Sequence, residues 1–171
     1  MHLIEVNENS KYINDIEQVY ISAFPEAERT EFKNLLGGFF PNSKLYVLLD
    51  NENFLGFTFV TMNDKILYVV YLAVKGEYRN KGYGTFMLNK ICGMYSNKAV
   101  CLCAEKPETS YDSATRRIEF YKRNGFELQN IQFDCYGVLF YIMCKGKFDR
   151  EDFINLMLKC FPVCKDFKEI E

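Results

Sequence analysis

The residues from Arg79 to Thr85, RNKGYGT, place two cations and two glycines just after an apolar run. The residues that follow have the apolar spacing of a helix, so this loop is expected to lead into a helix N-terminus. The first amides of a helix have no acceptor within the helix, and the helix dipole favours a negative charge beside them. Glycines let such amides approach an anion closely. The loop is therefore a candidate site for a phosphate-like group.

Side chains and backbone would both contribute to this site. Arg79 and Lys81 would add positive charge to the backbone amides. On composition alone, a tight turn with solvated cations is the alternative interpretation. The residues of the candidate anion site are Arg79, Asn80, Lys81, Gly82, Tyr83, Gly84 and Thr85.

Two familiar phosphate-binding motifs fit this loop poorly. The nucleotide triphosphate motif G-x-x-x-x-G-K-[ST] fails because, counted from Gly76, Lys81 stands where its second glycine is required. The dinucleotide motif G-x-G-x-x-G fails because Met87 takes the place of its third glycine. Glu105 follows the next apolar strand, where a ribose-binding acid would sit. A NAD-type dinucleotide-binding enzyme therefore stays open as an alternative function.

The elements that would position this loop alternate between strand and helix patterns, in the order β-α-α-β-β-β-α-β-α-β-β-α. The apolar run 66–74, the helix after the glycine loop and the strand 99–104 form a βαβ unit, so these two strands should be parallel. Polar turns within 44–62 and 127–144 indicate antiparallel hairpins. The sequence therefore predicts an α/β fold of the α+β type, in which a mixed, mostly antiparallel sheet has a central parallel strand pair and helices on both faces.

Helix signals near the two ends of the chain suggest how it is organised. Ser10 is expected to cap a first helix that ends at Pro25, and Asp149 is expected to cap a last amphipathic helix. Since no linker composition separates the elements, residues 1–148 are predicted to form one domain. Residues 149–171 are predicted to be a C-terminal helical extension packed on it.

The composition excludes several classes of function. A chain of 171 residues, 49% of them hydrophobic, can bury the core of one domain. Its net charge of −2 gives no general attraction to nucleic acid. The longest apolar run, 66–74, is far shorter than the roughly 20 residues that span a bilayer. We therefore expect no nucleic-acid partner and no membrane partner. Because the N-terminus shows no secretory signal, we also expect a cytoplasmic protein.

Cysteine and histidine usage limits the available chemistry. The seven cysteines are an odd number and lie mostly in apolar segments, so we expect buried, reduced thiols. No CxxC pair exists and His2 is the sole histidine, so no metal site is expected. A catalytic triad built on histidine would have to use this near-terminal residue, which removes a large class of hydrolases.

Two motifs together resemble one enzyme family. Arg79, Gly82 and Gly84, spaced Arg-x-x-Gly-x-Gly between a strand and a helix, resemble the pyrophosphate-binding loop of the GNAT superfamily of acyl-CoA-dependent N-acetyltransferases. The segment FYKRNGF, residues 120–126, resembles the second signature of that superfamily, and the element order from residue 3 to about 145 resembles its fold. The resemblance implies transfer of an acetyl group from acetyl-CoA to a primary amine, by direct attack in a ternary complex.

The resemblance also implies roles for individual residues. The backbone of Leu72, Ala73 and Val74 would pair with the pantetheine arm of the coenzyme, and the loop 79–85 would hold its diphosphate. Tyr121 matches the tyrosine that gives a proton to the departing thiolate in this family. A core tyrosine on the apolar face of its helix is the alternative interpretation of Tyr121.

The general base is less clearly indicated. A primary amine with a pKa near 10.4 is only about one part in 10³ neutral at pH 7, so the site must deprotonate it. Many relatives carry a glutamate on the strand that matches 99–104, but Cys103 stands at one such position and Glu105 is the nearby carboxylate. Glu26 and Glu28 lie in a segment that resembles the acceptor side and could contact the amine instead. Cys103 as an acyl-accepting nucleophile lacks a histidine partner.

The acceptor and the assembly stay open at this point. A small amine, an antibiotic, an amino acid and a protein terminus all fit the sequence. Because Cys103 occupies a position where relatives often have glutamate, a non-catalytic coenzyme A-binding sensor with the same fold is a second alternative function. The last helix, expected over 149–161, would pack on the sheet, form a homodimer contact or shape the acceptor pocket.

Overall fold

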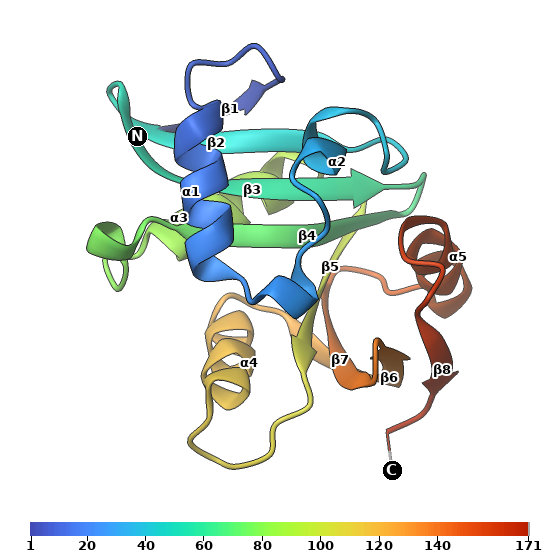
Figure 1. Cartoon of the computed structure of the whole chain (residues 1–171). Coiled ribbons are helices and arrows are strands. Elements are labelled where there is room, and N and C mark those ends of the chain that lie inside the picture. Colours follow the sequence, from blue (N-terminus) through green and yellow to red (C-terminus); the bar gives the residue numbers. More distant parts are fainter. Residues whose placement is uncertain (171) are drawn as a thin grey trace. The chain divides into compact units, whose positions relative to one another are not determined.

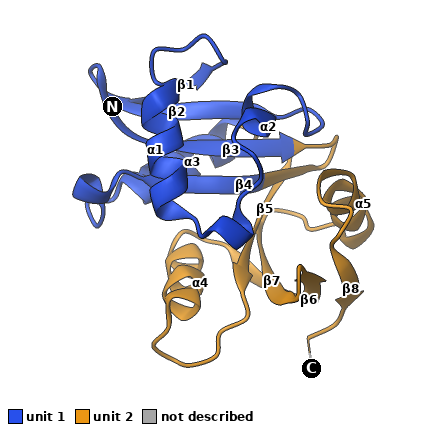
Figure 2. Ribbon diagram, in the orientation of Figure 1, with its two compact units in different colours: residues 1–61, 69–94 blue, residues 62–68, 95–171 orange. Residues whose placement is uncertain are grey.

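The computed structural model describes residues 1–170 (Figure 1). The chain divides into two compact units, which are described separately (Figure 2). Unit 1 consists of residues 1–61 and 69–94, and unit 2 consists of residues 62–68 and 95–171. One strand, β4, begins in unit 2 and continues in unit 1.

Unit 1 holds the first strands of the sheet, three α-helices and two short 3-10 helices. Its elements are β1 (His2–Val6), α1 (Ile13–Ala23), the short 3-10 helix η1 (Glu26–Glu28), α2 (Lys33–Leu36), β2 (Lys44–Asp50), nearly all of β3 (Asn53–Met62), most of β4 (Ile66–Val74), the 3-10 helix η2 (Gly76–Tyr78) and α3 (Tyr83–Met94). Unit 2 holds the start of β4, β5 (Ala99–Glu105), α4 (Ser113–Arg123), β6 (Glu127–Cys135), β7 (Val138–Lys145), α5 (Arg150–Cys160) and β8 (Lys165–Lys168).

The strands hydrogen-bond in the order β1-β2-β3-β4-β5-β7-β6-β8. β4 pairs with β5 in parallel, with Ile66 opposite Ala99. The pairs β1–β2, β2–β3, β5–β7, β6–β7 and β6–β8 are antiparallel. The predicted mixed, mostly antiparallel sheet with a central parallel pair is confirmed.

Helices cover both faces of the strands in unit 1. On one face, the Tyr20 ring of α1 lies 6.4 Å from the Phe57 ring of β3. On the other, Met87 of α3 packs against Leu48 and Leu55. Leu48 is paired with Gly56, so the next residue, Phe57, points to the opposite face. Figure 1 shows α1 in front of these strands.

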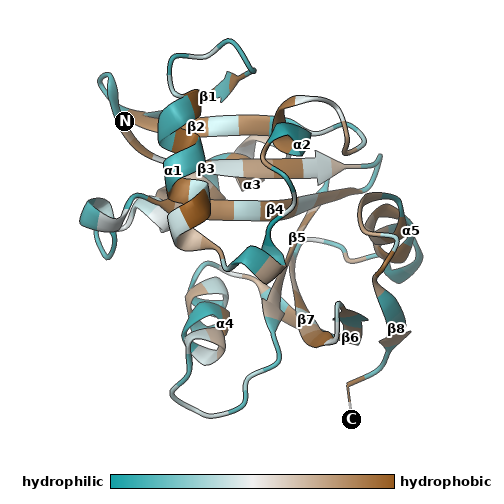
Figure 3. Ribbon diagram, viewed as in Figure 1, coloured by the Kyte–Doolittle hydropathy of each residue, from teal (hydrophilic) through white to brown (hydrophobic). Residues whose placement is uncertain are grey.

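The burial of β2 to β4 explains their nearly continuous apolar sequences. Five consecutive residues of β2, from Leu45 to Leu49, are buried, and so is every residue of β3 from Phe54 to Met62. Strands covered on both faces lose the polar–apolar alternation of half-exposed strands. Figure 3 shows apolar positions recurring along these three strands.

Gly56 is required by a close approach between β3 and β4. A bulge in the register leaves Leu55 as an extra residue in β3, and Leu55 O accepts a hydrogen bond from Lys75 N (2.8 Å). A methyl group at Gly56 would collide with the carbonyl oxygen of Ala73 and lie 3.0 Å from Val74 Cα. Backbone atoms cannot move aside as a flexible side chain can.

We therefore expect Gly56→Ala to lower the free energy of unfolding by about 1–3 kcal/mol, the range for overpacked interiors. Urea denaturation of both variants would measure this. Gly93→Ala is the matched control, because it adds the same methyl group in α3 where no atom lies within 4 Å. A Gly56→Ala protein as stable as Gly93→Ala would contradict the close approach.

Two helix caps give different outcomes. Asp149 caps α5 as predicted, since its side chain accepts a hydrogen bond from Asp152 N (3.0 Å). Ser10 does not cap α1, so that prediction is wrong. Its hydroxyl accepts from Tyr12 N (3.3 Å), and Tyr12 itself occupies the cap position. Ser10 therefore forms a turn before the helix.

The C-terminal segment contains more than the predicted helix. In unit 2, the Phe153 ring of α5 lies 6.0 Å from the Tyr68 ring, and Lys65 forms an ion pair with Asp152 (2.6 Å). Strand β8, which the sequence did not predict, then pairs with β6. These contacts fit an extension packed on the protein, while the division at residue 148 stays a prediction. Glu171 lies outside the described residues.

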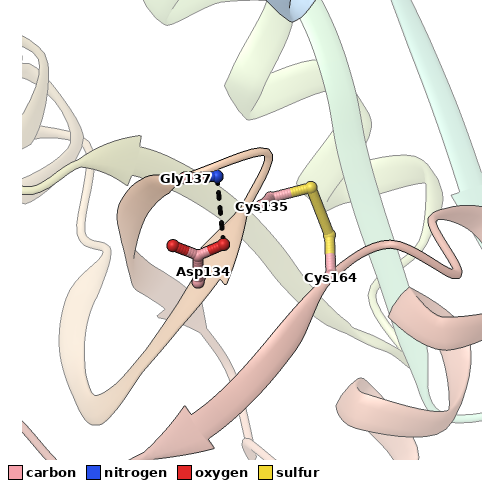
Figure 4. Close-up of a disulfide and its surroundings, with 4 residues drawn as sticks. All are labelled: Asp134, Cys135, Gly137 and Cys164. Carbon is pink, nitrogen blue, oxygen red and sulfur yellow. Dashed lines mark hydrogen bonds between the residues drawn. A yellow bond between two sulfur atoms is a disulfide. The ribbon is translucent and has the colours of Figure 1, made fainter.

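A disulfide joins Cys135 at the end of β6 to Cys164 just before β8 (Figure 4). The prediction of reduced thiols is therefore wrong for these two cysteines. The adjoining turn is closed by a hydrogen bond from Gly137 N to the Asp134 carboxylate (3.0 Å). The other five cysteines, all within the described residues, form no disulfide. Within residues 1–170, no helix has the length and apolar character needed to cross a membrane.

Candidate functional site

The glycine loop lies in unit 1 between β4 and α3. After the short helix η2, residues 79–82 are exposed, and α3 begins at Tyr83. Phe86 N donates to Gly82 O (3.0 Å), a bond of the helical i to i−4 type. The amides of residues 83–85 therefore belong to the first turn, where a helix supplies no acceptors of its own. The predicted loop leading into a helix N-terminus is confirmed.

The backbone of this loop is not covered by other atoms at Gly82, next to the amides that a diphosphate would contact. Gly82 has a φ of +84°, a left-handed conformation that favours glycine. A Cβ added at Gly82 would meet no atom within 4 Å. Asn80 is also left-handed, with a φ of +61°. The bare backbone and the free space fit a bulky anion.

Cations surround the loop. Arg79 Nε donates to the carbonyl oxygen of Val74 (3.2 Å), so its guanidinium lies beside the end of β4. Lys81 Nζ lies 5.5 Å from the centre of the Tyr78 ring, and Lys75 Nζ lies 5.9 Å from the same ring. Lys75 already pairs with Glu77 (3.2 Å), so Arg79 and Lys81 are the positive side chains that suit a ligand with negative charge.

The end of β4 and the loop share one hydrophobic cluster. Leu72 and Val74 pack with Tyr83 against the core that Met87 forms with its neighbours in β2 and β3. Ala73 is buried as well. The structure thus brings the predicted pantetheine-binding strand and the predicted diphosphate loop together on a rigid base.

Tyr121 lies on α4 in unit 2, with its ring 5.5 Å from Phe120 and 6.3 Å from Phe126. Burial raises the pKa of the Tyr121 hydroxyl to about 12, while the charge of Arg117 lowers this pKa and Cys103 raises it. The hydroxyl therefore keeps its proton at neutral pH and can donate a hydrogen bond.

Glu105 lies at the end of β5 and pairs with a residue that sequence reasoning missed. Arg117 Nη2 donates to Glu105 Oε2 at 3.1 Å, and both side chains are about one-third exposed (38% for Arg117 and 31% for Glu105). Arg117 also precedes Tyr121 by one helical turn, and its charge lowers the pKa of the Tyr121 hydroxyl. An ion pair between residues twelve apart, across a loop, leaves no periodic signal in the sequence.

The Cys103 thiol is poorly suited to attack a thioester. Burial raises its pKa to about 12, and a hydrogen bond with Tyr68 lowers that pKa only in part. Since the thiolate is the nucleophilic form, this environment opposes an acyl-accepting role.

Glu26 and Glu28 lie on η1 in unit 1. The Tyr71 hydroxyl on β4 donates to the backbone oxygen of Glu28 (2.9 Å), which holds this turn against the strand.

Within residues 1–170, no group of three or more histidine, cysteine, aspartate or glutamate side chains could hold a metal ion.

Residues 41–128 match the family model of the GNAT acetyltransferase domain, which is about half of the chain. The chain belongs to the GNAT acetyltransferase family. The matched residues include the glycine loop, Glu105 and Tyr121. No curated protein matches this GNAT protein in sequence.

Solved structures of the family share the fold of this GNAT protein. A GNAT-family protein from Bacteroides thetaiotaomicron is 25% identical, with a TM-score of 0.77 over 91% of this chain and 92% of that one. The aminoglycoside 6'-N-acetyltransferase from Enterococcus faecium is 14% identical, with a TM-score of 0.66 over 87% and 100%. A GNAT acetyltransferase from Elizabethkingia anophelis with acetyl-CoA bound is 13% identical, with a TM-score of 0.62 over 85% and 97%.

The site residues predicted for this GNAT protein fall into two sets. The residues predicted for the coenzyme, 72–74 and 79–85, lie in unit 1 with Glu26 and Glu28. Tyr121 and Glu105 lie in unit 2 with Arg117. The pyrophosphate motif therefore coincides with an open loop, and the tyrosine motif coincides with a protonated hydroxyl beside an ion pair.

Proposed function

We propose that this GNAT protein transfers an acetyl group from acetyl-CoA to a primary amine, by direct attack of the amine in a ternary complex. The open left-handed backbone at Gly82, at the start of α3, is the observation that carries the proposal. Two similar structures support it, since one holds acetyl-CoA and the other is an aminoglycoside N-acetyltransferase.

Unit 1 would bind the coenzyme. The amides of residues 83–85 and the side chains of Arg79 and Lys81 would hold the diphosphate, through the helix dipole and charge-assisted hydrogen bonds. The backbone of Leu72–Val74 would pair with the pantetheine arm and polarise the thioester carbonyl. Acetyl-CoA supplies the activated thioester, so no metal is required for the transfer.

Tyr121 would act on the leaving sulfur. A thiol has an ordinary pKa near 8.5, so a thiolate departing at neutral pH benefits from a donor. With its pKa raised to about 12, the Tyr121 hydroxyl is protonated across the physiological range. It would stabilise the developing negative charge by a hydrogen bond and then give the thiolate its proton.

Glu105 would remove the proton of the acceptor ammonium, directly or through water. Its ion pair with Arg117 orients the carboxylate. In Glu105→Gln the amine must lose its proton to solvent, so we expect activity that is low near neutral pH and recovers at high pH. Rate profiles from about pH 6 to pH 9 would measure this change.

Glu119→Gln is the matched control for this profile. Glu119 is a half-exposed carboxylate on α4 that pairs with Lys122 (3.0 Å) and has no role in the proposal. Its profile should follow that of the parent protein. If Glu105→Gln were equally silent, Glu26 and Glu28 would be the carboxylates to test next.

A second candidate function is a coenzyme A-binding sensor without turnover. The observation that favours it is the Cys103 thiol, which stands where relatives often carry glutamate and has a pKa too high for a base at neutral pH. Release of free thiol from acetyl-CoA in the presence of a broad amine panel separates the two functions. Turnover with any amine well above solution aminolysis excludes the sensor.

The proposal extends to the setting of the protein. The proposed setting is the cytoplasm, and the net charge of −2 supports action on acetyl-CoA and an amine rather than on nucleic acid. A contact through α5 is the proposed route to a homodimer, and sedimentation of the intact chain would test it.

A further inference from the structure

Arg29 carries a guanidinium that the described chain leaves unneutralised. Its Nε is enclosed and has no hydrogen-bond partner, and no ion pair joins this side chain to any residue from 1 to 170. A guanidinium group is always charged and offers five hydrogen-bond donors. A donor that is enclosed without an acceptor loses its hydrogen bond to water, which lowers the stability of the fold. Such a group in a folded protein calls for an explanation, and a ligand is one.

The backbone on both sides of Arg29 is held in place. The Tyr71 hydroxyl donates to Glu28 O (2.9 Å) and accepts from Thr30 N (3.3 Å). The Tyr20 hydroxyl donates to Thr30 O (2.8 Å). Both tyrosines are at most 5% exposed, and their rings meet edge-on at 4.9 Å. Arg29 is therefore presented from a fixed position, which lowers the entropy cost of binding a ligand.

The hydroxyls of Tyr20 and Tyr71, which hold the backbone on both sides of Arg29, form a clamp. This clamp lies next to the strand that is proposed to bind the coenzyme. Tyr71 belongs to β4 and directly precedes Leu72–Val74, the residues proposed to pair with the pantetheine arm. The positive charge of Arg29 is felt by both clamp hydroxyls, where it lowers each pKa, although burial is the larger effect and raises them. The guanidinium therefore lies close to Tyr20 and Tyr71 within unit 1.

The charges around Arg29 are mixed. In the segment FPEAERTE, residues 24–31, Arg29 is the one cation, and Glu26 and Glu28 stand before it. The next cation, Lys33, already pairs with Glu31 (2.6 Å). A dianion would be repelled by the two glutamates, whereas a molecule with one positive and one negative group matches the segment.

We propose that Arg29 binds the carboxylate of the acceptor, so that the acceptor is an amino acid or another amine that carries a carboxylate. This inference rests on the proposed function. A guanidinium fork binds a carboxylate through two parallel hydrogen bonds. Glu26 and Glu28 would favour the ammonium end of the same molecule.

Free amino acids and their carboxamides test the proposal with the intact protein and acetyl-CoA. Leucine and leucinamide, and lysine and lysinamide, differ in each pair by the negative charge. Rates are compared at a pH high enough to hold both amines neutral. We expect kcat/KM to be about 10- to 100-fold higher for the acids, the range that a charge-assisted hydrogen bond supplies.

Arg29→Gln should bring the acid-to-amide ratio close to one, mainly by raising the KM of the acid. Arg29→Lys, which keeps the charge but loses the fork, should retain part of the ratio. Lys33→Gln is the matched control, since it removes a neighbouring cation that is already paired, and its ratio should equal that of the parent. The melting temperature of Arg29→Gln should hold or rise, because an unpartnered buried donor is lost.

Several results would overturn the proposal. Equal rates for acids and amides, or a preference that survives Arg29→Gln, would remove Arg29 from acceptor binding. A marked fall in melting temperature for Arg29→Gln would make it a structural residue. Preference for phosphoethanolamine over the amino acids would indicate a phosphate rather than a carboxylate.

The outcomes also separate this inference from the proposed function. Turnover of uncharged amines without turnover of amino acids would leave acetyl transfer standing and reject the carboxylate. If no amine reacted, calorimetry of leucine binding to the protein with acetyl-CoA would still decide. Absence of binding there would reject the role of Arg29 independently of catalysis.

Discussion

Replacing Tyr121 with phenylalanine is expected to lower kcat by about 10²-fold, within the usual range for general acid–base catalysis. The change removes one oxygen and keeps the ring contacts with Phe120 and Phe126, so fold and acetyl-CoA affinity should persist. Because the pKa of the hydroxyl is about 12, the hydroxyl keeps its proton up to about pH 10. The kcat of the parent enzyme should therefore not fall through loss of this proton below about pH 10.

Single-turnover rates of Tyr121→Phe and of a matched control measure this effect. Tyr111→Phe removes the same oxygen from a tyrosine of unit 2 that is 89% exposed, and it should leave kcat unchanged. A Tyr121→Phe protein with the full single-turnover rate would return this residue to a packing role in α4.

Valine at Gly82 is expected to weaken acetyl-CoA binding by at least about 10²-fold, equivalent to roughly 2.7 kcal/mol. Its side chain would fill the space that the bare backbone leaves open and would disfavour the φ of +84°. Gly84→Val, in the first turn of α3, should act in the same direction. Titration calorimetry with acetyl-CoA and with NAD would measure both affinities.

Gly137→Val separates strain from binding in this test. Gly137 has a φ of +80° and free space around its missing side chain, as Gly82 does, but it lies in the turn between β6 and β7. Both variants should lose a similar stability, of order 1–3 kcal/mol, while Gly137→Val keeps its affinity for acetyl-CoA. Unchanged affinity in a folded Gly82→Val protein, or tighter binding of NAD than of acetyl-CoA, would favour the dinucleotide alternative.

Local patterns in the sequence predicted most of the sheet. The apolar runs of β2 to β5 and the polar turns between paired strands are signals that lie within a few residues of each other. Strand β8 escaped prediction because KDFK is short and largely exposed, and its pairing with β6 depends on a neighbour more than thirty residues away. The disulfide from Cys135 to Cys164 anchors the same region and is equally invisible in local sequence.

The candidate site shows the same contrast. The glycine loop was predictable because its motif, its strand and its helix are adjacent in the chain. Arg117 was not, because its partner Glu105 lies on another element and a surface arginine is common. Arg29 was not predicted beside Glu26 and Glu28, since only the folded structure shows that its Nε is enclosed without a hydrogen-bond partner.

Direct transfer of the acetyl group from acetyl-CoA to an amine is tested by a rapid-quench single-turnover experiment. The acetyl-CoA carries its label on the acetyl group. The protein in excess over acetyl-CoA is mixed with an amine that the thiol-release screen has identified, and the label is followed on coenzyme, protein and amine. Direct attack predicts that label passes to the amine with none accumulating on the protein, and the raised pKa of the Cys103 thiol agrees with this expectation. Label that first appears on the protein, or that never reaches this amine, would contradict the account.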